Sequence, residues 1–451
     1  MDVEENLESL LYEWRRVYIE RTGRSKELFE RACRVFPGGV TYVLRFFDPY
    51  PLYVVRGRGS RVWDADDNEY IDFWMGHGAH VLGHSPDFVV EAVSEVAKMG
   101  THLGFENPYA VEYAEFLTRV LPGVEMLRFT MSGTEANMYA LRLARAYTRR
   151  SYVVKIEGGW HGGYDALHTY VRLPGGPESA GLPEEYLKYT IAIPFNNLNA
   201  AEDVLKKYPV AAIIVEPVIG GGGCIPPEEG YLKGLRQLAD EHGALLIFDE
   251  VITGFRLALG GAQEFFNVKA DIAVYGKAVG GGYSGAGAFG GRAEVMELLN
   301  HLKYPDPRSR AYHGGTFVGN PINAVAGYTL VKYLAEHRSL YDHANALWEW
   351  ARRELDKTCE DHNRLCWATG IGTMTGIHFT KTRPKTYADV RDLRWSKVIE
   401  KALHFYMRIN SVLYMDEKTP RLLPALNQPI EEVKIFVELF KKFLEQVTKK
   451  S

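Results

Sequence analysis

The chain has 451 residues, more than one small hydrophobic core usually serves, so two domains are expected. Apolar residues make up 46% and charged residues 24%, as in ordinary globular proteins, and the net charge of −4 argues against nucleic acid or an anionic membrane as partner. The longest apolar runs have strand length, and the acidic, amphipathic start lacks the features of a signal peptide. A cytoplasmic protein is therefore expected.

Two rare residue types add to this picture. The four cysteines are scattered without the spacing of a metal site, and we interpret them as reduced and structural: Cys33, Cys224, Cys359 and Cys366. Glutamine is scarce, whereas Glu, Lys, Arg and Tyr are frequent, which hints at a thermophilic source.

The first part of the chain predicts helix and then a small hairpin. Residues 5–36 read as helix in two pieces, with a break near Thr22-Gly23. The stretch SRVWDADDNEYIDF predicts two short strands joined by a polar turn at residues 66–68.

From about residue 85, apolar strand-like runs alternate with helical segments. The predicted strands are MLRFT, SYVVKI, VAAIIV, ALLIFD and DIAVYG. Such alternation indicates an α/β fold with a mostly parallel sheet that is covered on both faces. After Asn320 the chain turns helical, and a mixed tail runs to the end. We predict an N-terminal helical segment with part of a small domain at 1–75, a large domain at 76–330, and the rest of the small domain at 331–451.

Ligands of open parallel sheets bind beyond the carboxyl ends of the strands, so the residues that follow each strand are informative. Ser132, Gly133 and Thr134 follow MLRFT and open a helix, which suits a phosphate. A plain helix cap is the alternative. Trp160 ends the next strand between glycines and could stack on a flat ligand. An ordinary buried tryptophan is the alternative there.

Acids and one lysine end the remaining strands. Glu216 follows AAIIV, Asp249 and Glu250 follow LLIF, and Lys277 follows DIAVYG. A buried lysine at a strand end is costly unless it reacts or pairs. A phosphate cradle, an aromatic face, a buried acid and an amine together match pyridoxal 5′-phosphate, whose aldehyde bonds to a lysine. Asp249 would keep the pyridine nitrogen protonated, and Glu250 would point away into a structural contact. Two helix-capping or loop acids are the alternative.

Several stretches now resemble a known family. FTMSGTEANMYALRLARAY, EGGWHGGYD, IIVEPV, LLIFDEVITGFR, YGKAVGGG and YHGGTFVGNPINAVAG are similar to the class III, fold type I pyridoxal-phosphate aminotransferases. SKELFERACRVFPGGVTYVLRFF and VWDADDNEYIDF bring the chain closest to the branch of glutamate-1-semialdehyde 2,1-aminomutase. The resemblance covers about residues 25 to 440, in the same order and spacing.

The resemblance implies a role for each candidate residue. Lys277 would bond to the cofactor aldehyde and shuttle protons, and Asp249 would pair with the pyridine nitrogen. The other residues expected to hold the cofactor are Ser132, Gly133 and Thr134 at the phosphate, Trp160 and Val251 against the ring, Glu216 beside it, and Thr316, which would reach the phosphate of the neighbouring subunit. A homodimer with a shared active site follows from the last role.

Departures from the branch bear on the substrate. The aminomutases read approximately NSPVR where this chain reads TYVLR, Ser-Trp-Gly where it reads Gly76-His77-Gly78, and Asn where it has Gly221. Their C-terminal Ser-Gln-Phe-Glu segment is absent. We therefore favour a ping-pong aminotransferase of the omega-transaminase type, which takes an amine, β-amino acid or ω-amino acid donor and a keto acid or aldehyde acceptor. Glutamate-1-semialdehyde 2,1-aminomutase is the alternative.

Arg45 is the first candidate for binding a substrate carboxylate, since a guanidinium matches its geometry, and Arg421 is the second. A structural or surface arginine is the alternative for each.

Other readings fit less well. The loop context and the lack of nearby acids argue against a metal site at His77, His80 and His84. GAGAFG matches a dinucleotide fingerprint but opens no helix. A cofactor-sensing regulator needs a DNA-binding domain, for which the first 36 residues are too few and too acidic. Racemases and decarboxylases share the scaffold and stay open.

Overall fold

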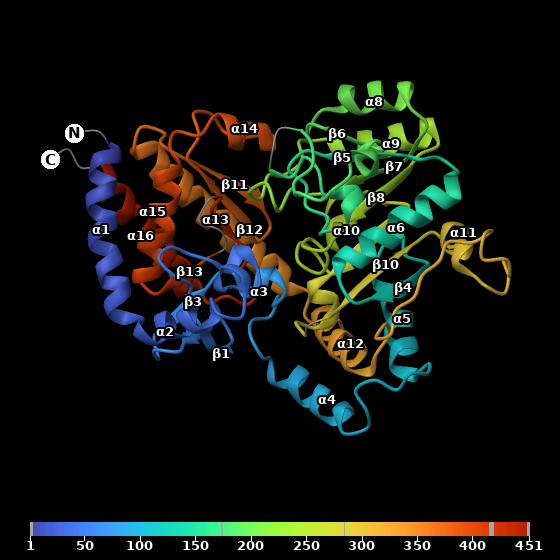
Figure 1. Ribbon diagram of the computed structural model, residues 1–451, viewed down its shortest axis with the longest axis horizontal. Helices are drawn as coiled ribbons and strands as arrows, with labels where there is room; N and C mark the ends of the chain where they lie inside the picture. Colours follow the sequence, from blue (N-terminus) through green and yellow to red (C-terminus); the bar gives the residue numbers. More distant parts are fainter. Residues whose placement is uncertain (1–2, 173–174, 284, 415–418, 449–451) are drawn as a thin grey trace.

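The computed structural model describes residues 3–172, 175–283, 285–414 and 419–448 (Figure 1). Two lobes lie side by side: one is built around a large sheet, and the other contains both ends of the chain. In the view of Figure 1 the large sheet is on the right and the helices near the termini are on the left.

The large sheet has seven strands, and all its pairs are parallel except those of β10. In spatial order they are β4 (Met126–Thr130), β10 (Gly287–Gly291), β9 (Ile272–Gly276), β8 (Leu245–Asp249), β7 (Val210–Val215), β5 (Tyr152–Ile156) and β6 (Thr190–Ile193). Every residue of β7, β8 and β9 is buried, as their continuous apolar sequences predict. The fold class is confirmed. Strands β6 and β10 were not predicted, and β10 is rich in glycine, which is rare in strands.

Helices cover this sheet and are capped by side chains at several starts. The main ones are α4 (Asp87–Ala97), α5 (Pro108–Val120), α6 (Gly133–Thr148), α8 (Leu198–Lys207), α9 (Tyr231–His242) and α12 (Pro321–Glu336). Asn107, Asn197 and Asn320 each accept a hydrogen bond from a first-turn N–H of α5, α8 and α12. Within the described ranges, no helix is both long and apolar enough for a membrane span.

The second lobe joins segments far apart in the sequence. Its sheets are β1 (Val54–Arg58), β2 (Arg61–Asp64), β3 (Glu69–Asp72) with β13 (Val412–Leu413), and β11 (Trp367–Ile371), β12 (Met374–His378) with β14 (Arg421–Leu422). Its long helices are α1 (Val3–Arg21), α2 (Gly23–Ala32), α13 (Ser339–Asp361), α15 (Lys397–Ile409) and α16 (Ile430–Thr448). The indole of Trp14 in α1 lies 5.2 Å from the ring of Tyr406 in α15. The predicted helix break and the predicted hairpin are both present; the predicted domain boundaries stay predictions.

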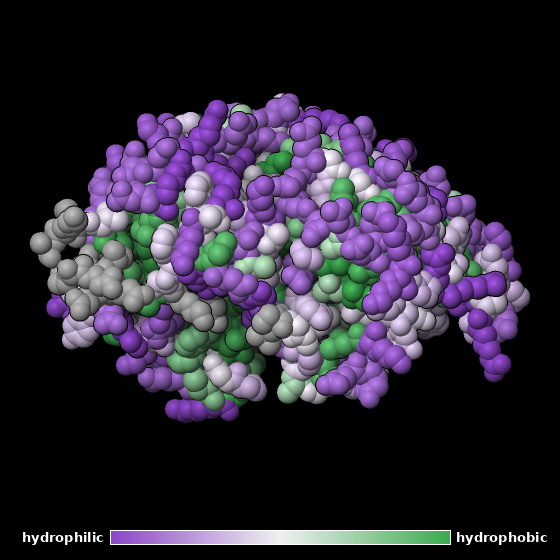
Figure 2. All heavy atoms as spheres, turned by 90° about the horizontal axis from the view of Figure 1, so that it is seen from above, coloured by the Kyte–Doolittle hydropathy of each residue, from purple (hydrophilic) through white to green (hydrophobic). Residues whose placement is uncertain are grey.

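Short elements complete the chain: η1 (Pro37–Gly39), η2 (Val43–Arg45), α3 (Met75–Gly78), η3 (Asp165–Leu167), α7 (Glu184–Leu187), α10 (Gly261–Phe266), η4 (Lys277–Gly280), α11 (Ala293–Met296), η5 (Glu297–Leu299) and α14 (Tyr387–Asp392). Seen from above in Figure 2, polar residues cover most of the molecule, and apolar residues gather along one edge on both sides of a notch.

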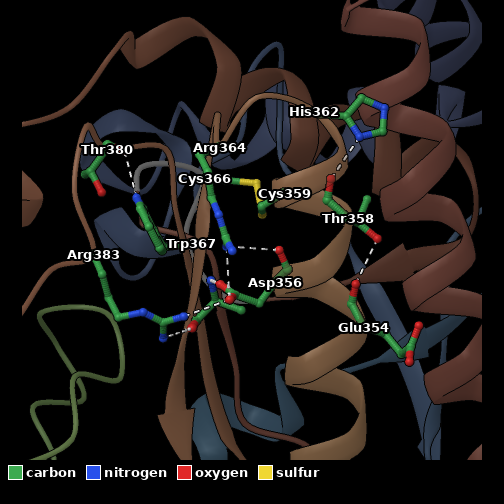
Figure 3. The surroundings of a disulfide bond; sticks show 11 residues. Glu354, Asp356, Thr358, Cys359, His362, Arg364, Cys366, Trp367, Thr380 and Arg383 are labelled. Carbon is green, nitrogen blue, oxygen red and sulfur yellow. Dashed lines mark hydrogen bonds and ion pairs between the residues drawn. A yellow bond between two sulfur atoms is a disulfide. The ribbon is translucent and has the colours of Figure 1, made fainter.

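The prediction that all four cysteines are reduced is wrong, because Cys359 and Cys366 form a disulfide (Figure 3). Their Cα atoms are 5.1 Å apart, since α13 ends between them and the chain turns directly back into β11. Sequence spacing alone did not reveal this turn. Cys33 is exposed and Cys224 is buried, and both are free thiols.

Removing the disulfide should lower the free energy of unfolding. For a loop of this length, the chain-entropy model gives about 2.5 kcal/mol for the double change Cys359→Ala/Cys366→Ala. Urea unfolding without reductant measures the difference, with Cys33→Ala as the control at an exposed free thiol. A loss below about 0.5 kcal/mol would show that the cross-link is absent or without effect.

Candidate active site

The turn from β4 into α6 leaves two backbone N–H groups without an acceptor in the helix. The Ser132 hydroxyl accepts a hydrogen bond from Glu135 N–H at 3.1 Å, and Ser132 O accepts the first helical bond, from Ala136 N–H. Gly133 N–H and Thr134 N–H precede the first full turn and therefore lack an intrahelical partner. Ser132 is thus a helix cap, and the helix start also presents two donors suited to an anion.

Close packing holds this turn against Val251, which follows β8, and against the loop that contains Gly162. A Cβ on Gly133 would lie 2.6 Å from Cγ2 of Val251, and a Cβ on Gly162 would overlap the Thr134 hydroxyl. Both glycines are therefore required for the approach of their neighbours. Gly162 also has a φ of +83°, which favours glycine.

Lys277 follows β9 and faces a cavity of about 320 Å³. Its backbone has a φ of +50°, an uncommon conformation for a residue with a side chain and one that recurs at functional sites. Burial lowers the pKa of Lys277 to about 8, although the charges of Asp249 and Glu216 act in the opposite direction. The amine is therefore far more easily deprotonated than an exposed lysine.

Asp249, at the end of β8, is held by three donors. Asn137 Nδ2 lies 2.8 Å and His161 Nδ1 lies 2.7 Å from its Oδ2, and Val251 N–H donates to Oδ1 at 3.0 Å. Burial lowers the pKa of His161. The sequence prediction missed Asn137 and His161, although His161 directly follows Trp160 and Asn137 lies one turn beyond Thr134 in α6.

Glu250 points away from Asp249, as predicted, because successive side chains alternate across a strand. Its carboxylate accepts hydrogen bonds from Ala262 N–H at 2.6 Å, Gln263 N–H at 3.1 Å and the Thr253 hydroxyl at 2.8 Å. It therefore secures the start of α10, and burial raises its pKa to about 7. Asp249 thus faces the cavity, whereas the adjacent Glu250 faces α10.

Glu216 holds the loop that carries Trp160. Its Oε1 accepts from Trp160 N–H at 2.8 Å and its Oε2 from Gly220 N–H at 3.1 Å. Burial, followed by the charge of Asp249, raises the pKa of Glu216. The Trp160 indole meets His168 edge to face, with ring centroids 5.5 Å apart.

Lys155 in β5 was not predicted, yet it is fully buried directly behind this loop. Its ammonium donates to Gly159 O at 3.1 Å, Leu167 O at 3.1 Å and Thr169 O at 2.5 Å. These three carbonyls lie on either side of Trp160 and His161, so one cation ties together the whole loop. Burial lowers the pKa of Lys155 to about 7, while the charge of Glu216 acts in the opposite direction.

Replacing Lys155 with methionine should loosen the Trp160 loop. The change leaves buried carbonyls unpaired, and each one that finds no new donor costs about 1–3 kcal/mol of folding free energy. We expect a lower Tm and a weaker equilibrium affinity for added cofactor, measured by calorimetry and by absorbance titration. Lys233→Met, on the exposed face of α9, is the matched control. Unchanged values for both variants would remove Lys155 from this role.

The cavity collects most of the predicted cofactor residues. It is lined by Ser132, Gly133, Thr134, Trp160, Glu216, Asp249, Val251 and Lys277, together with the unpredicted Asn137, His161, Ile252 and Tyr283.

Three predicted residues do not line the cavity. Thr316 is exposed in a loop. Arg45 is exposed in η2, where Nη1 donates to the Thr41 hydroxyl at 2.9 Å. Arg421 is buried in β14 and donates to Gly220 O at 3.0 Å, but its charge helps to lower the pKa of Lys277.

The fold and the site together define a fold type I pyridoxal-phosphate enzyme. More particularly, the chain belongs to the aminotransferase class-III family, whose model matches residues 45–444. The chain is 40% identical over 381 residues to a glutamate-1-semialdehyde 2,1-aminomutase of Archaeoglobus fulgidus, covering 84% of this chain and 89% of that protein. It is 45% identical over 366 residues to the enzyme of the same name from Aquifex aeolicus, covering 79% and 84%.

Solved structures agree in fold. An omega-transaminase from Sphaerobacter thermophilus superimposes with a TM-score of 0.85 at 31% identity, covering 94% of this chain and 98% of that chain. A β-phenylalanine aminotransferase from Variovorax paradoxus gives a TM-score of 0.86 at 30% identity, covering 97% of each. A transaminase with pyridoxal phosphate bound gives 0.83 at 30% identity, covering 94% and 98%.

Pyridoxal 5′-phosphate is the cofactor, and the residues present fit it. The start of α6 offers two donors without intrahelical partners, as a phosphate requires. His161 Nε2 and Asn137 Oδ1 are buried without a partner among the described residues, so polar capacity remains beside Asp249. Lys277 supplies an amine with a lowered pKa in the same cavity. The donor set therefore has a place for phosphate, ring nitrogen and aldehyde.

Proposed function

We propose that this chain is an aminotransferase of the omega-transaminase type, which moves an amino group from an amine, β-amino acid or ω-amino acid to a keto acid or aldehyde in a ping-pong cycle. One observation carries the proposal: Lys277, with its lowered pKa, and Asp249, which accepts three hydrogen bonds, line the same cavity. A cytoplasmic location and a thermophilic source accompany the proposal as predictions.

Each residue has a defined task in this proposal. When bound, the cofactor supplies a carbonyl that condenses with amines and a ring that accepts the electron pair left by a departing proton. Neutral Lys277 Nζ takes the proton from the substrate carbon and returns it at the next step. Asp249, held by Asn137 and His161, keeps a proton on the ring nitrogen.

The remaining tasks are binding and orientation. The start of α6, from Ser132 to Thr134, holds the phosphate. Trp160 and Val251 confine the ring from its two faces, and the carboxylate of Glu216 fixes the backbone of Trp160.

Glutamate-1-semialdehyde 2,1-aminomutase is the second candidate, because the curated relatives at 40–45% identity carry that name. Support for the first candidate comes from the loop after Glu216. A Cβ on Gly221 would lie 3.3 Å from both Trp160 Cβ and Gly158 O, so the asparagine that the aminomutases carry there would crowd Trp160.

One experiment separates the two candidates. The cofactor-loaded protein is mixed with a panel of amines, β-amino acids and glutamate 1-semialdehyde, and the visible absorbance of the cofactor is followed. An aminotransferase converts the donor to its carbonyl product and then aminates pyruvate or 2-oxoglutarate. An aminomutase instead turns glutamate 1-semialdehyde into its amino isomer with no net acceptor. Isomerisation of glutamate 1-semialdehyde without transfer to an acceptor, or absence of both reactions, would refute the aminotransferase proposal.

A homodimer is part of the proposal, because the loops beside Thr316 are apolar and exposed. Phe105 is 88% exposed and Phe317 is 52% exposed, and His102 meets Phe317 with ring centroids 4.9 Å apart. Contiguous exposed apolar side chains of this kind mark interaction surfaces. A second copy seated here would bring its Thr316 towards the phosphate site.

Replacing Arg45 with alanine should raise KM for donors that carry a carboxylate by about 10- to 100-fold, the value of a hydrogen bond between charged groups. Simple amines without a carboxylate should keep their KM. Steady-state kinetics with matched donor pairs measures the split, and Arg149→Ala, at an exposed site, is the control. Equal losses on both donor types would remove Arg45 from the substrate site.

A further inference from the structure

A second cavity lies where the two lobes meet, away from the cofactor site. Its volume is about 490 Å³, compared with about 320 Å³ for the cofactor cavity. One wall comes from the lobe of the large sheet, namely Asn196 and residues 225–228. The other wall comes from α13, β11 and residues 383–385 of the second lobe. No described residue lines both cavities, so the proposed amino transfer leaves this one without a role.

Hydrogen bonds fix the wall on the side of the large sheet. Asn196, which has a φ of +60°, accepts from Glu228 N–H at 2.8 Å and donates to Lys385 O at 3.0 Å. The side chains of Lys385 and Glu228 also form an ion pair at 2.7 Å. Because Lys385 belongs to the second lobe, these contacts join the two walls at the rim of the cavity.

The disulfide at the end of α13 and a cluster of charges fix the opposite wall (Figure 3). Asp356 pairs with Arg383 at 2.8 Å and with Arg364 at 3.1 Å. The same carboxylate accepts from Ala368 N–H at 3.2 Å. Both guanidiniums also lie over the Trp367 indole, 4.9 Å and 5.3 Å from its centroid. A cavity with two fixed walls loses little conformational freedom when a ligand enters, which favours binding.

Basic residues outnumber acidic ones among the charged residues that line the cavity. They are Arg352, Arg353, Lys357, Arg383 and Lys385 against Glu228, Glu349, Asp356 and Glu360. Every one of these acids already has a basic partner. Arg352 and Lys357, by contrast, have no acid within ion-pair distance in the described part of the chain. The cavity therefore has an excess of positive charge, which attracts an anionic ligand.

Arg352 carries the more deeply buried part of this charge. Its Nη1 donates to Gly372 O at 2.6 Å and to the Thr375 hydroxyl at 3.2 Å, which anchors the side chain to the turn between β11 and β12. Burial lowers the pKa of Arg352 to about 10, while the charge of Glu349 acts in the opposite direction. The guanidinium is still protonated at neutral pH. Its attraction for an anion is screened less than that of an exposed arginine, because water reaches it only from the cavity.

The wall on the side of the large sheet adds an apolar surface, which consists of Ile225, Pro226 and Pro227. Sites for small molecules combine such apolar lining with a few polar groups, and they have volumes of about 300–1,000 Å³. Two unpaired cations match the charge of a phosphate dianion better than that of a single carboxylate. The cavity thus suits a ligand with a phosphate at one end and an apolar ring at the other.

We propose that this cavity binds a phosphate-bearing molecule of mononucleotide size, with its phosphate at Arg352 and Lys357 and its ring against residues 226–227. Such a ligand contacts both lobes at once. Anions of this kind bind here in addition to the cofactor, whose own phosphate belongs to the start of α6.

Calorimetry on the cofactor-loaded protein tests the proposal, because bound cofactor already fills the other phosphate site. The probes are adenosine 5′-monophosphate, adenosine and inorganic phosphate. We expect the monophosphate to bind about tenfold or more tightly than either of the other two, since it alone engages both the cations and the apolar wall.

Lys357→Met removes an exposed cation that has no ion-pair partner among the described residues, so the fold should be unaltered. It should weaken binding of the monophosphate by about 3- to 10-fold. Arg352→Met should weaken it by about 10- to 100-fold, and its Tm is measured in parallel because Arg352 also anchors the β11–β12 turn. Glu349→Gln should tighten binding, because its charge opposes the phosphate. Lys441→Met, at an exposed lysine of α16, is the matched control and should bind as the wild type does.

Three results would overturn the proposal. The first is that the monophosphate does not bind at millimolar concentration. The second is that Lys357→Met binds it as tightly as the wild type and Lys441→Met do. The third is that adenosine or inorganic phosphate binds as tightly as the monophosphate, which would show that the cavity does not recognise a phosphate and a ring together. None of these results bears on amino transfer, which is measured separately.

Discussion

Replacing Lys277 with alanine is expected to lower kcat for amino transfer by about 10⁴-fold, the upper end of what a general base contributes. The reason is that Lys277 is the amine that faces the cavity, with its pKa lowered by burial to about 8 and its backbone held at a φ of +50°. No other lysine lines this cavity among the described residues. Turnover of a donor that the wild type accepts measures the effect.

A matched control and a direct label accompany this variant. Lys269→Ala, an exposed lysine just before β9, should keep wild-type turnover. Borohydride treatment of cofactor-saturated wild-type protein, followed by peptide mapping, should place a pyridoxyl group on Lys277. A label elsewhere, or near-normal turnover in Lys277→Ala, would overturn the assignment.

Replacing Asp249 with asparagine is expected to lower kcat by about 10²- to 10³-fold, the equivalent of breaking a buried charged pair. A neutral amide cannot keep a proton on the ring nitrogen, and it also changes the contacts with Asn137 and His161. Single-turnover absorbance changes with a fixed donor measure the chemical step directly.

Glu250→Gln is the control that the strand itself provides. Glu250 is the next residue, but it accepts two hydrogen bonds from the start of α10 and one from the Thr253 hydroxyl. We expect this variant to lower Tm while the single-turnover rate stays near that of the wild type. Similar rates in Asp249→Asn and Glu250→Gln would show that the two acids do not divide their roles as the structure indicates.

Much of the site could be predicted because apolar strand sequences locate strand ends. LLIFDE and DIAVYGK place Asp249 and Lys277 at one edge of a parallel sheet, and the buried β8 and β9 confirm that placement. The partners of Asp249 could not be predicted in the same way, since Asn137 and His161 come from different segments that meet only in the fold.

Other features depend on packing that no local pattern encodes. The sequence around Lys155 reads as an ordinary strand, and its three carbonyl acceptors become visible only when the loop closes over it. Strand β10 has the sequence GAFGG, which lacks the β-branched and aromatic residues that are common in strands, apart from one phenylalanine. The left-handed turn at residues 75–78 likewise depends on Arg256, which donates to Gly78 O and is distant in the sequence.

The cross-link between α13 and β11 has a consequence for how the protein persists in a cell. Both sulfur atoms are buried, so glutathione or thioredoxin can attack them only when the end of the helix opens. The bond is thus shielded kinetically in a thiol-rich compartment for as long as the lobe stays closed.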